Sequence, residues 1–361
     1  MQSIWRLLLR LACLAVLAGF AAGAAADDTL RKDANALFGQ LQAPPAVPSA
    51  EAELGRALFW DPAISSNGHV SCGSCHPAAA WGADAEPLSL DALGKHTPRN
   101  APTVFNVGGQ PSLRWLGDRA DLTSQAEGSL TGSMGFPSKK AALETMRDLG
   151  YEAAFRAVYR GQPDPMSTAN YGRAIAAYEA TLTTPGPFDR FLAGDLTALS
   201  PQQQAGLYAF IDTGCATCHN GTLLGGAGYQ KFGIVKDYWT ATGSPRIDDG
   251  RASLTGNKAD RYVFRVPMLR NIVRTGPYFH DGSVRDLPRA VKIMADVQLG
   301  VTLDDRTTAL IVAFLDSLTG SVPASYAPPP PPSSGIMAFL GNLAGSIQAI
   351  DGAPAGPPRP R

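Results

Sequence analysis

The sequence predicts a mainly helical protein of two domains. Its 361 residues suffice for two domains with a generous apolar core. The pentapeptide Cys-x-x-Cys-His occurs at residues 72–76 and again at 215–219, 143 positions later. A segment with helical spacing of apolar residues and a helix-start signal precedes each copy. We therefore expect one motif in each domain, close behind a helix.

The first of these helices is expected to begin after Ser49 and to stop before Pro62. The apolar residues on its inner face are Leu54, Ala57 and Leu58. The second is expected to begin at a capping box with proline at its first helical position, residues 200–203, and to end at Gly214. Its predicted inward residues are Leu207, Tyr208 and Ile211.

Two more helices complete the predicted domains. One runs from about residue 168 to residue 182 and closes the first domain. The other starts at a box formed by Thr302 to Asp305 and ends at Gly320, with apolar residues Leu310, Ile311, Phe314, Leu315 and Leu318. The predicted boundaries are 27–190 for the first domain and 191–320 for the second. We expect residues 321–361, which include a polyproline stretch, to form a disordered tail.

Residues 1–26 have the pattern of a secretory signal peptide. Arg6 and Arg10 precede an apolar run, and three alanines end at Ala26. A membrane anchor is the alternative, but the run is short for a bilayer span. We expect export to the periplasm with cleavage near Ala26. The 31 basic and 31 acidic residues cancel, which argues against a nucleic-acid partner.

After removal of this leader, which contains Cys13, the two motifs account for every cysteine: Cys72, Cys75, Cys215 and Cys218. Two disulfides, a redox dithiol or half of a zinc site are alternative readings of such pairs. A histidine directly after the second cysteine in both copies favours attachment of c-type haem. The prediction is thus two cytochrome c-like helical domains, each with one covalently attached haem.

Function then depends on the second axial ligand, because the motif supplies only one, His76 or His219. For the second haem the candidates are Met294, Met268 and His280, and we prefer Met294 because it shortly precedes the terminal helix. For the first haem nothing comparable stands out. The weak candidates are His69, His96, Met134, Met146 and Met166. We expect an open or weakly closed first haem.

Several segments beside the motifs resemble the bacterial dihaem cytochrome c peroxidase family. These segments are PRNAPTVFN, RWLGDRADLTSQA, YVFRVPMLRN, GPYFHDGS and AVKIMADVQLG. The resemblance runs from about residue 54 to residue 320, in the order and spacing of the family. It implies a peroxidatic haem on His76 and a high-potential haem on His219 and Met294. Electrons from a small cytochrome or cupredoxin enter at the latter, and hydrogen peroxide is the oxidant.

The resemblance also implies roles for single residues. Trp115 corresponds to a tryptophan between the haems, and a packed aromatic is the alternative. Gln125 corresponds to a glutamine of the distal pocket. The residues that correspond to an interdomain calcium site are Asn100, Thr275 and Pro277. His280 is expected to support the haem pocket, and family members are often homodimers.

Two departures from the family pattern bear on mechanism. His96 is only three residues before Arg99, closer than the histidine that caps the peroxidatic iron in typical members. The family's distal glutamate is replaced by Ser133 or Gly135, and its loss should slow peroxide cleavage. Glu127 is the nearest acid. The alternatives to a peroxidase are therefore a maturation-type enzyme that oxidises a protein and a dihaem electron carrier.

Overall fold

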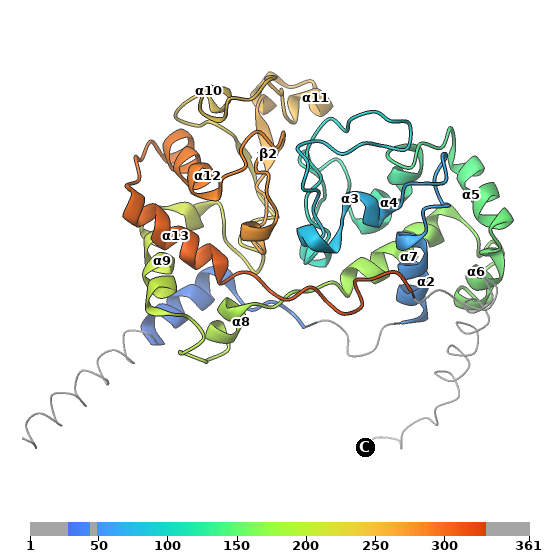
Figure 1. The fold of residues 1–361 in the computed structure, drawn as a ribbon, viewed down its shortest axis with the longest axis horizontal. Coiled ribbons are helices and arrows are strands. Elements are labelled where there is room, and N and C mark those ends of the chain that lie inside the picture. Colours follow the sequence, from blue (N-terminus) through green and yellow to red (C-terminus); the bar gives the residue numbers. More distant parts are fainter. Residues whose placement is uncertain (1–27, 44–48, 330–361) are drawn as a thin grey trace, which may run out of the picture.

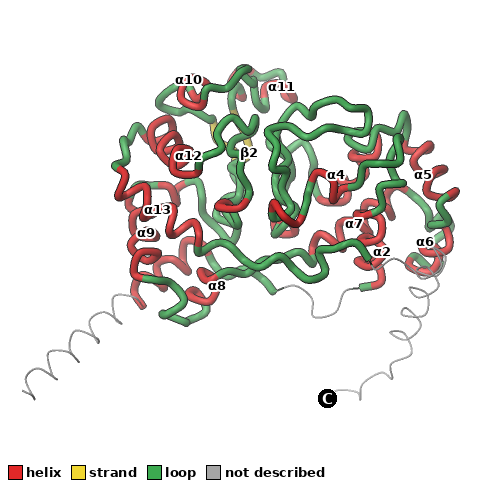
Figure 2. The backbone as a smooth tube through the Cα atoms, in the orientation of Figure 1, coloured by secondary structure: helices red, strands yellow, loops and turns green. Residues whose placement is uncertain are grey.

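The computed structural model describes residues 28–43 and 49–329, which form two helical lobes side by side (Figure 1). Helices and long loops make up almost all of both lobes (Figure 2). Within the described residues, the sheet structure is one antiparallel pair, β1 (Tyr229–Lys231) and β2 (Val263–Arg265). The prediction of a mainly helical fold is confirmed. None of the helices in these ranges has the length and hydropathy to cross a bilayer.

The first lobe is built around a close crossing of two helices. A Cβ on Gly55 would lie 1.8 Å from the carbonyl oxygen of Ala174, so only glycine allows this approach. The helices of this lobe are α2 (Ala50–Trp60), α3 (Cys72–Cys75), α4 (Leu122–Thr131), α5 (Lys139–Asp148), α6 (Glu152–Val158) and α7 (Thr168–Ala180). Gly55 lies on α2 and Ala174 on α7, and the first-lobe core forms around their crossing.

The second lobe repeats this arrangement. A Cβ on Gly206 would lie 1.9 Å from the carbonyl oxygen of Leu310, where two helices cross. The helices of this lobe are α8 (Pro187–Leu192), α9 (Pro201–Asp212), α10 (Tyr238–Thr242), α11 (Ala252–Thr255), α12 (Leu287–Met294), the π-helical turn Ala295–Leu299 and α13 (Asp305–Asp316). The short 3₁₀ turns of both lobes are Ala78–Ala80, Val107–Gly109, Cys215–Thr217, Lys258–Asp260 and Ile272–Arg274.

The predicted helix starts are largely confirmed. Ser49 accepts a hydrogen bond from the amide of Ala52, and Ser200 forms the expected capping box with Gln203. The last helix begins later than predicted, because Asp304 caps α13. The inward orientation predicted for Tyr208 is wrong, since half of its surface is exposed.

The N-terminal segment belongs to a different lobe from the one predicted. Residues 28–38 are helical, and their buried side chains Leu30, Ala34 and Phe38 join the core of the second lobe. Phe38 packs edge-on against Phe188 of α8, with ring centroids 5.6 Å apart. The boundary at 27–190 is therefore corrected here, because this apolar stripe is covered by the second lobe.

The C-terminal segment crosses in the opposite direction (Figure 1). Residues 321–329, predicted as the start of a disordered tail, lie against the first lobe, and Tyr326 is 3% exposed in its core. Burial of this aromatic ring in the first-lobe core stabilises the position of the segment. The rest of the predicted tail, 330–361, and the predicted signal peptide, 1–26, lie outside the described residues.

Candidate active site

Each Cys-x-x-Cys-His motif forms a short helical turn. The first turn follows a capping serine, and the second follows the end of α9. In the first, Ser71 and Ser74 form a capping box that starts α3. In the second, Gly214 has a φ of 95°, which turns the chain from α9 into the 3₁₀ turn Cys215–Thr217. The four cysteines are free thiols in the structure. Neither pair forms a disulfide, so all four sulfur atoms are available for attachment.

The two motif histidines have the same orientation. Nδ1 of His76 lies 2.8 Å from the carbonyl oxygen of Gly82, and Nδ1 of His219 lies 3.1 Å from that of Leu224. Each carbonyl accepts a hydrogen bond from the Nδ1–H group and leaves the lone pair of Nε2 available to a metal. Burial lowers the pKa of both imidazoles, which favours the neutral form that binds metals.

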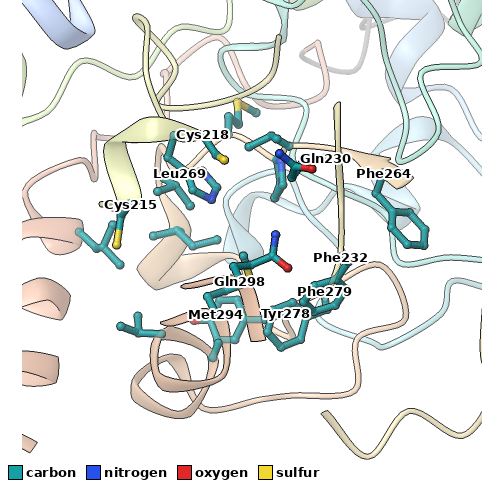
Figure 3. A pocket seen from close by; sticks show the side chains of 18 of the residues that line it. Cys215, Cys218, Gln230, Phe232, Phe264, Leu269, Tyr278, Phe279, Met294 and Gln298 are labelled. Carbon is teal, nitrogen blue, oxygen red and sulfur yellow. The ribbon is translucent and has the colours of Figure 1, made fainter. Parts of the chain in front are cut away.

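A largely apolar cavity of about 240 Å³, here called the second cavity, adjoins the second motif (Figure 3). Its walls include Cys215, Cys218 and His219 on one side and Met294 at the end of α12. Figure 3 shows Met294 across the cavity from Cys218. The structure thus brings together the second motif and the methionine that sequence analysis preferred as its axial ligand.

Met268 and His280, the other two candidates, line the same cavity but have different neighbours. Met268 follows Pro267, which packs against Gly225 beside His219, and its sulfur accepts a hydrogen bond of 3.6 Å from Nε2 of Gln110. His280 is 2% exposed and stacks on Phe264 at a centroid distance of 4.4 Å. Of the three, Met268 and His280 already have these partners, and Met294 stays the predicted ligand.

Trp115 lies where the two lobes meet and lines the second cavity. Its indole nitrogen donates a hydrogen bond of 2.9 Å to the carbonyl oxygen of Asn100. The side chain of Arg265 donates to the carbonyl oxygen of Arg114 at 2.8 Å, and its backbone amide donates to that of Trp115 at the same distance. These bonds fix the tryptophan against β2 of the second lobe.

The three candidate calcium ligands lie along the same cavity wall. Nδ2 of Asn100 donates to the carbonyl oxygen of Glu86 at 3.0 Å, which leaves Oδ1 of Asn100 available. Thr275 and Pro277 line the same cavity, and their backbone carbonyl oxygens are donors of the type that a hard cation takes. In the described part of the chain, no group of three histidine, cysteine or acidic side chains has the arrangement of a metal site.

A separate cavity, lined by polar and apolar side chains, adjoins Cys75 of the first motif. His96 lies on its wall, is exposed, and is held by a contact of 3.3 Å between its Nδ1 and the carbonyl oxygen of Leu88. The methionines that were weak candidate ligands lie instead in the first-lobe core, where Met134, Met146 and Met166 are at most 2% exposed. His69 is exposed next to its own motif.

Two positions bear on the missing distal acid. Gln125 lies on α4, and its side-chain oxygen is buried without a hydrogen-bond partner in the structure. Glu127 on the same helix forms an ion pair with Lys139 and contacts α7 at Gly172. Glu127 is thus engaged elsewhere. A side chain at Gly135 would be strained, because its φ is 74° and a Cβ would lie 2.5 Å from Oγ of Ser66.

Sequence analysis missed several residues of these sites. Tyr278 and Gln298 line the second cavity near Met294 (Figure 3), and Arg265 holds the Trp115 segment. Tyr278 lies in the segment GPYFHDGS, which carries part of the family resemblance. No local sequence pattern, however, distinguishes a residue of a cavity wall from a residue of the hydrophobic core. Tyr326 was missed because the composition after residue 320 indicates disorder.

The donor atoms present fit haem at both motifs. Each motif offers two unpaired thiols and an imidazole whose Nδ1 is already bound to a backbone carbonyl. The second motif adds an apolar cavity whose lining includes the thioether of Met294, a side chain that can ligate haem iron.

Comparison with known proteins identifies the family. The family model for di-haem cytochrome c peroxidase matches residues 49–197. Cytochrome c551 peroxidase of Pseudomonas aeruginosa is 42% identical over 320 residues, which cover 85% of this chain and 91% of that protein. The chain belongs to the di-haem cytochrome c peroxidase family. It is an oxidoreductase of the cytochrome c peroxidase type and carries two haems.

More distant members of this di-haem peroxidase family include enzymes with other names. The methylamine utilization protein MauG of Methylophilus methylotrophus is 29% identical over 298 residues, 77% of this chain and 85% of that protein. Among solved structures, a MauG-like protein associated with microbial copper homeostasis aligns with a TM-score of 0.70 and 25% identity, covering 80% of this chain and 97% of that one. The fold of the di-haem enzymes therefore extends over both lobes.

Proposed function

We propose that this di-haem peroxidase is exported to the periplasm, where it reduces hydrogen peroxide to water with electrons from a small cytochrome or cupredoxin. The reaction consumes one peroxide, two protons and two electrons and yields two water molecules. When bound, the haem on His219 and Met294 supplies electron storage and the haem on His76 supplies the site of peroxide reduction. The leader pattern of residues 1–26 supports export.

The observation that carries this proposal is the asymmetry between the two motif sites. The cavity of the second motif includes His219 together with Met294 in its lining, whereas the cavity beside Cys75 includes His96 and no methionine. A saturated site that exchanges electrons and an open site that binds an oxidant need this difference. Ile234 and Leu299 line the second cavity and are also exposed, so that cavity reaches the surface where a donor could approach.

Trp115 is proposed as the bridge for electrons between the two sites. Its position between the lobes and its fixed backbone favour this role over that of a packing residue alone. Asn100, which accepts its indole hydrogen bond, is also a proposed calcium ligand with Thr275 and Pro277. A bound cation would therefore stiffen the segment that holds the bridge.

The distal side of the first haem is proposed to contain Gln125. Its unpartnered oxygen is available to hydrogen-bond peroxide or water. Because Glu127 is paired with Lys139, no carboxylate replaces the family's distal acid by this route, and we expect slow peroxide turnover. His96 is proposed only as a weak gate, since its side chain is exposed beside Cys75 rather than packed over the motif.

The principal alternative is a maturation-type enzyme that oxidises a protein, which the similarity to MauG favours. Such enzymes are expected to use tyrosine as the second ligand of the high-potential haem. Tyr278 lines the same cavity as Met294 (Figure 3), so ligand identity separates the two functions. The other alternative, an electron carrier, requires both irons to be closed. The expected homodimer can be checked by analytical ultracentrifugation.

The proposal is tested with the haem-loaded enzyme and a reduced cytochrome c. We expect peroxide-dependent oxidation of the donor, one low-spin haem with methionine ligation, and one haem that binds cyanide in the half-reduced protein. Absence of turnover, together with two irons that exclude cyanide in every redox state, would leave only the electron carrier. Tyrosine ligation in the electron paramagnetic resonance spectrum would favour the maturation-type enzyme.

A further inference from the structure

The segment of residues 320–328, here called the C-terminal strap, connects the last helix of the second lobe to the first lobe (Figure 1). At its start, Gly320 donates to Oδ1 of Asn271 at 3.0 Å and accepts from the indole nitrogen of Trp81 at 3.0 Å. A Cβ on Gly320 would lie 2.3 Å from the carbonyl oxygen of Thr184, so the strap leaves the second lobe through a narrow passage.

The far half of the strap is bound by side chains of the first lobe. Tyr178 of α7 donates to the carbonyl oxygen of Ser325 at 3.1 Å, and Arg56 of α2 donates to that of Ala327 at 2.9 Å. These bonds satisfy backbone carbonyls that a mobile tail would offer to water. The strap is therefore an ordered element with polar anchors at both of its ends.

Tyr326 is the only strap residue named in the first-lobe core cluster with less than a tenth of its surface exposed. Its ring packs edge-on against Phe105 and Trp60, with centroids 4.6 and 5.1 Å away. Its hydroxyl donates a hydrogen bond of 2.5 Å to the backbone carbonyl oxygen of His76. Burial raises the pKa of Tyr326, so the phenol stays protonated and remains a donor.

This bond makes the first motif histidine different from the second. The backbone amide of His76 donates to Cys72 and its Nδ1 contacts Gly82, and equivalent bonds hold His219. The carbonyl of His76 has the additional bond from Tyr326. Within the described ranges, the structure records no side-chain hydrogen bond to the carbonyl of His219.

We propose that Tyr326 is a positioning residue for His76, through which the C-terminal strap of one lobe fixes the ligand of the haem in the other. The proposal rests on the assignment of His76 as an iron ligand in the proposed function. A ligand histidine whose backbone is held keeps its Nδ1 bond to Gly82, and that bond makes the imidazole a stronger donor to iron. Loss of the phenol hydroxyl weakens this donor and favours ferrous iron at the first haem.

The test is Tyr326→Phe, which removes the hydroxyl and keeps the ring that packs against Phe105. The matched control is Tyr159→Phe, because the hydroxyl of Tyr159 also donates to a backbone carbonyl, that of Asn170, at 2.8 Å in the same lobe. Spectroelectrochemistry of the holoenzyme measures both haems. At a fixed applied potential, we expect Tyr326→Phe to raise the ferrous-to-ferric ratio of the first haem about twofold to tenfold, the factor that one hydrogen bond supplies.

The second haem should be unchanged in both variants, and the first haem should be unchanged in Tyr159→Phe. An unaltered first-haem ratio in Tyr326→Phe, or an equal shift in the two variants, overturns the proposal. Spectra of the unmodified enzyme distinguish failure of the positioning proposal from failure of the proposed function. A first haem without histidine ligation contradicts the ligand assignment itself, whereas a histidine-ligated haem without peroxide turnover leaves the positioning test valid.

Discussion

At the residue scale, two methionines line the second cavity, and the sequence does not show how either is oriented relative to His219. Met294 ends α12 and faces the cavity across from Cys218, while Met268 accepts a hydrogen bond from Gln110 and packs beside Leu223. A thioether in contact with a hydrogen-bond donor is a packing residue as much as a ligand. We therefore expect substitution of Met294, but not of Met268, to change the midpoint potential of the second haem.

Met294→His should lower the midpoint potential of the second haem on the order of 0.2 V, because axial ligands span a range of roughly 0.8 V and methionine lies toward its high end. Potentiometric titration of the holoenzyme measures this. Met268→Leu is the control, with nearly the same side-chain volume in the same cavity, and should leave the potential unchanged. A fall in Met268→Leu but not in Met294→His would reverse the ligand assignment.

Gln125 supplies a second prediction at this scale. Gln125→Leu removes the amide proposed to contact peroxide and should lower kcat about 10²-fold, the usual effect of losing one well-placed hydrogen-bonding group. Gln110→Leu is the matched control, because the side-chain oxygen of Gln110 is also buried without a partner but lies at the second cavity. Stopped-flow reduction of peroxide by the half-reduced enzyme separates the two. Similar rates in both variants would exclude Gln125 from the distal site.

At the scale of elements, each lobe depends on a glycine where two helices cross. Alanine normally stabilises a helix relative to glycine by about 0.5–1 kcal/mol. At Gly206 the sign should reverse, since the added Cβ meets the backbone oxygen of Leu310, which cannot rotate away. We expect Gly206→Ala to lower the free energy of unfolding by about 3 kcal/mol, at the upper end for overpacked cores.

Urea unfolding followed by circular dichroism measures this loss. Gln202→Ala, at an exposed position of the same helix, controls for helix propensity and should change stability by less than about 0.5 kcal/mol. If Gly206→Ala were as stable as the unmodified protein, α9 and α13 could not lie as close together as the structure has them.

The same elements indicate how far sequence reasoning reaches. Ser49 and the box at Ser200 predicted two helix starts correctly, because capping depends on residues a few positions apart. Tyr208 was assigned to the wrong face, since helical spacing alone does not say how wide the covered stripe is. The motif residues were apparent for the same local reason, whereas Tyr278 and Gln298 of the second cavity have no such local signal.

At the scale of the whole molecule, each described end of the chain packs on the lobe formed by the opposite half of the sequence. The helix of residues 28–38 joins the second lobe, and Tyr326 joins the first. Composition and periodicity identify such segments as apolar or proline-rich but carry no information on which surface they cover. The structure therefore differs from the sequence prediction in the lobe to which residues 28–38 belong and in the order of residues 321–329.

The connection between the lobes contains a buried polar node centred on Thr184. Its hydroxyl accepts hydrogen bonds of 2.8 Å from the side-chain amides of Asn106 and Asn271. Both asparagines have positive φ, 60° and 62°, and each begins a 3₁₀ turn in the equivalent segment of its lobe. Asn271 also accepts from the amide of Gly320, where the C-terminal strap begins. One threonine thus joins the two lobes and the strap.

Thr184→Val keeps the shape of the side chain but leaves two buried amide donors without an acceptor, at a cost of about 1–3 kcal/mol each. We expect a loss of about 2–6 kcal/mol in the free energy of unfolding, measured in urea. The neighbour Thr183 is the matched control, because its hydroxyl is buried without a partner and Thr183→Val removes an unsatisfied group. That variant should be as stable as the unmodified protein or slightly more so. Equal losses in the two variants would mean that the cost arises from valine in this connection, and that the amide bonds to Thr184 do not hold the lobes together.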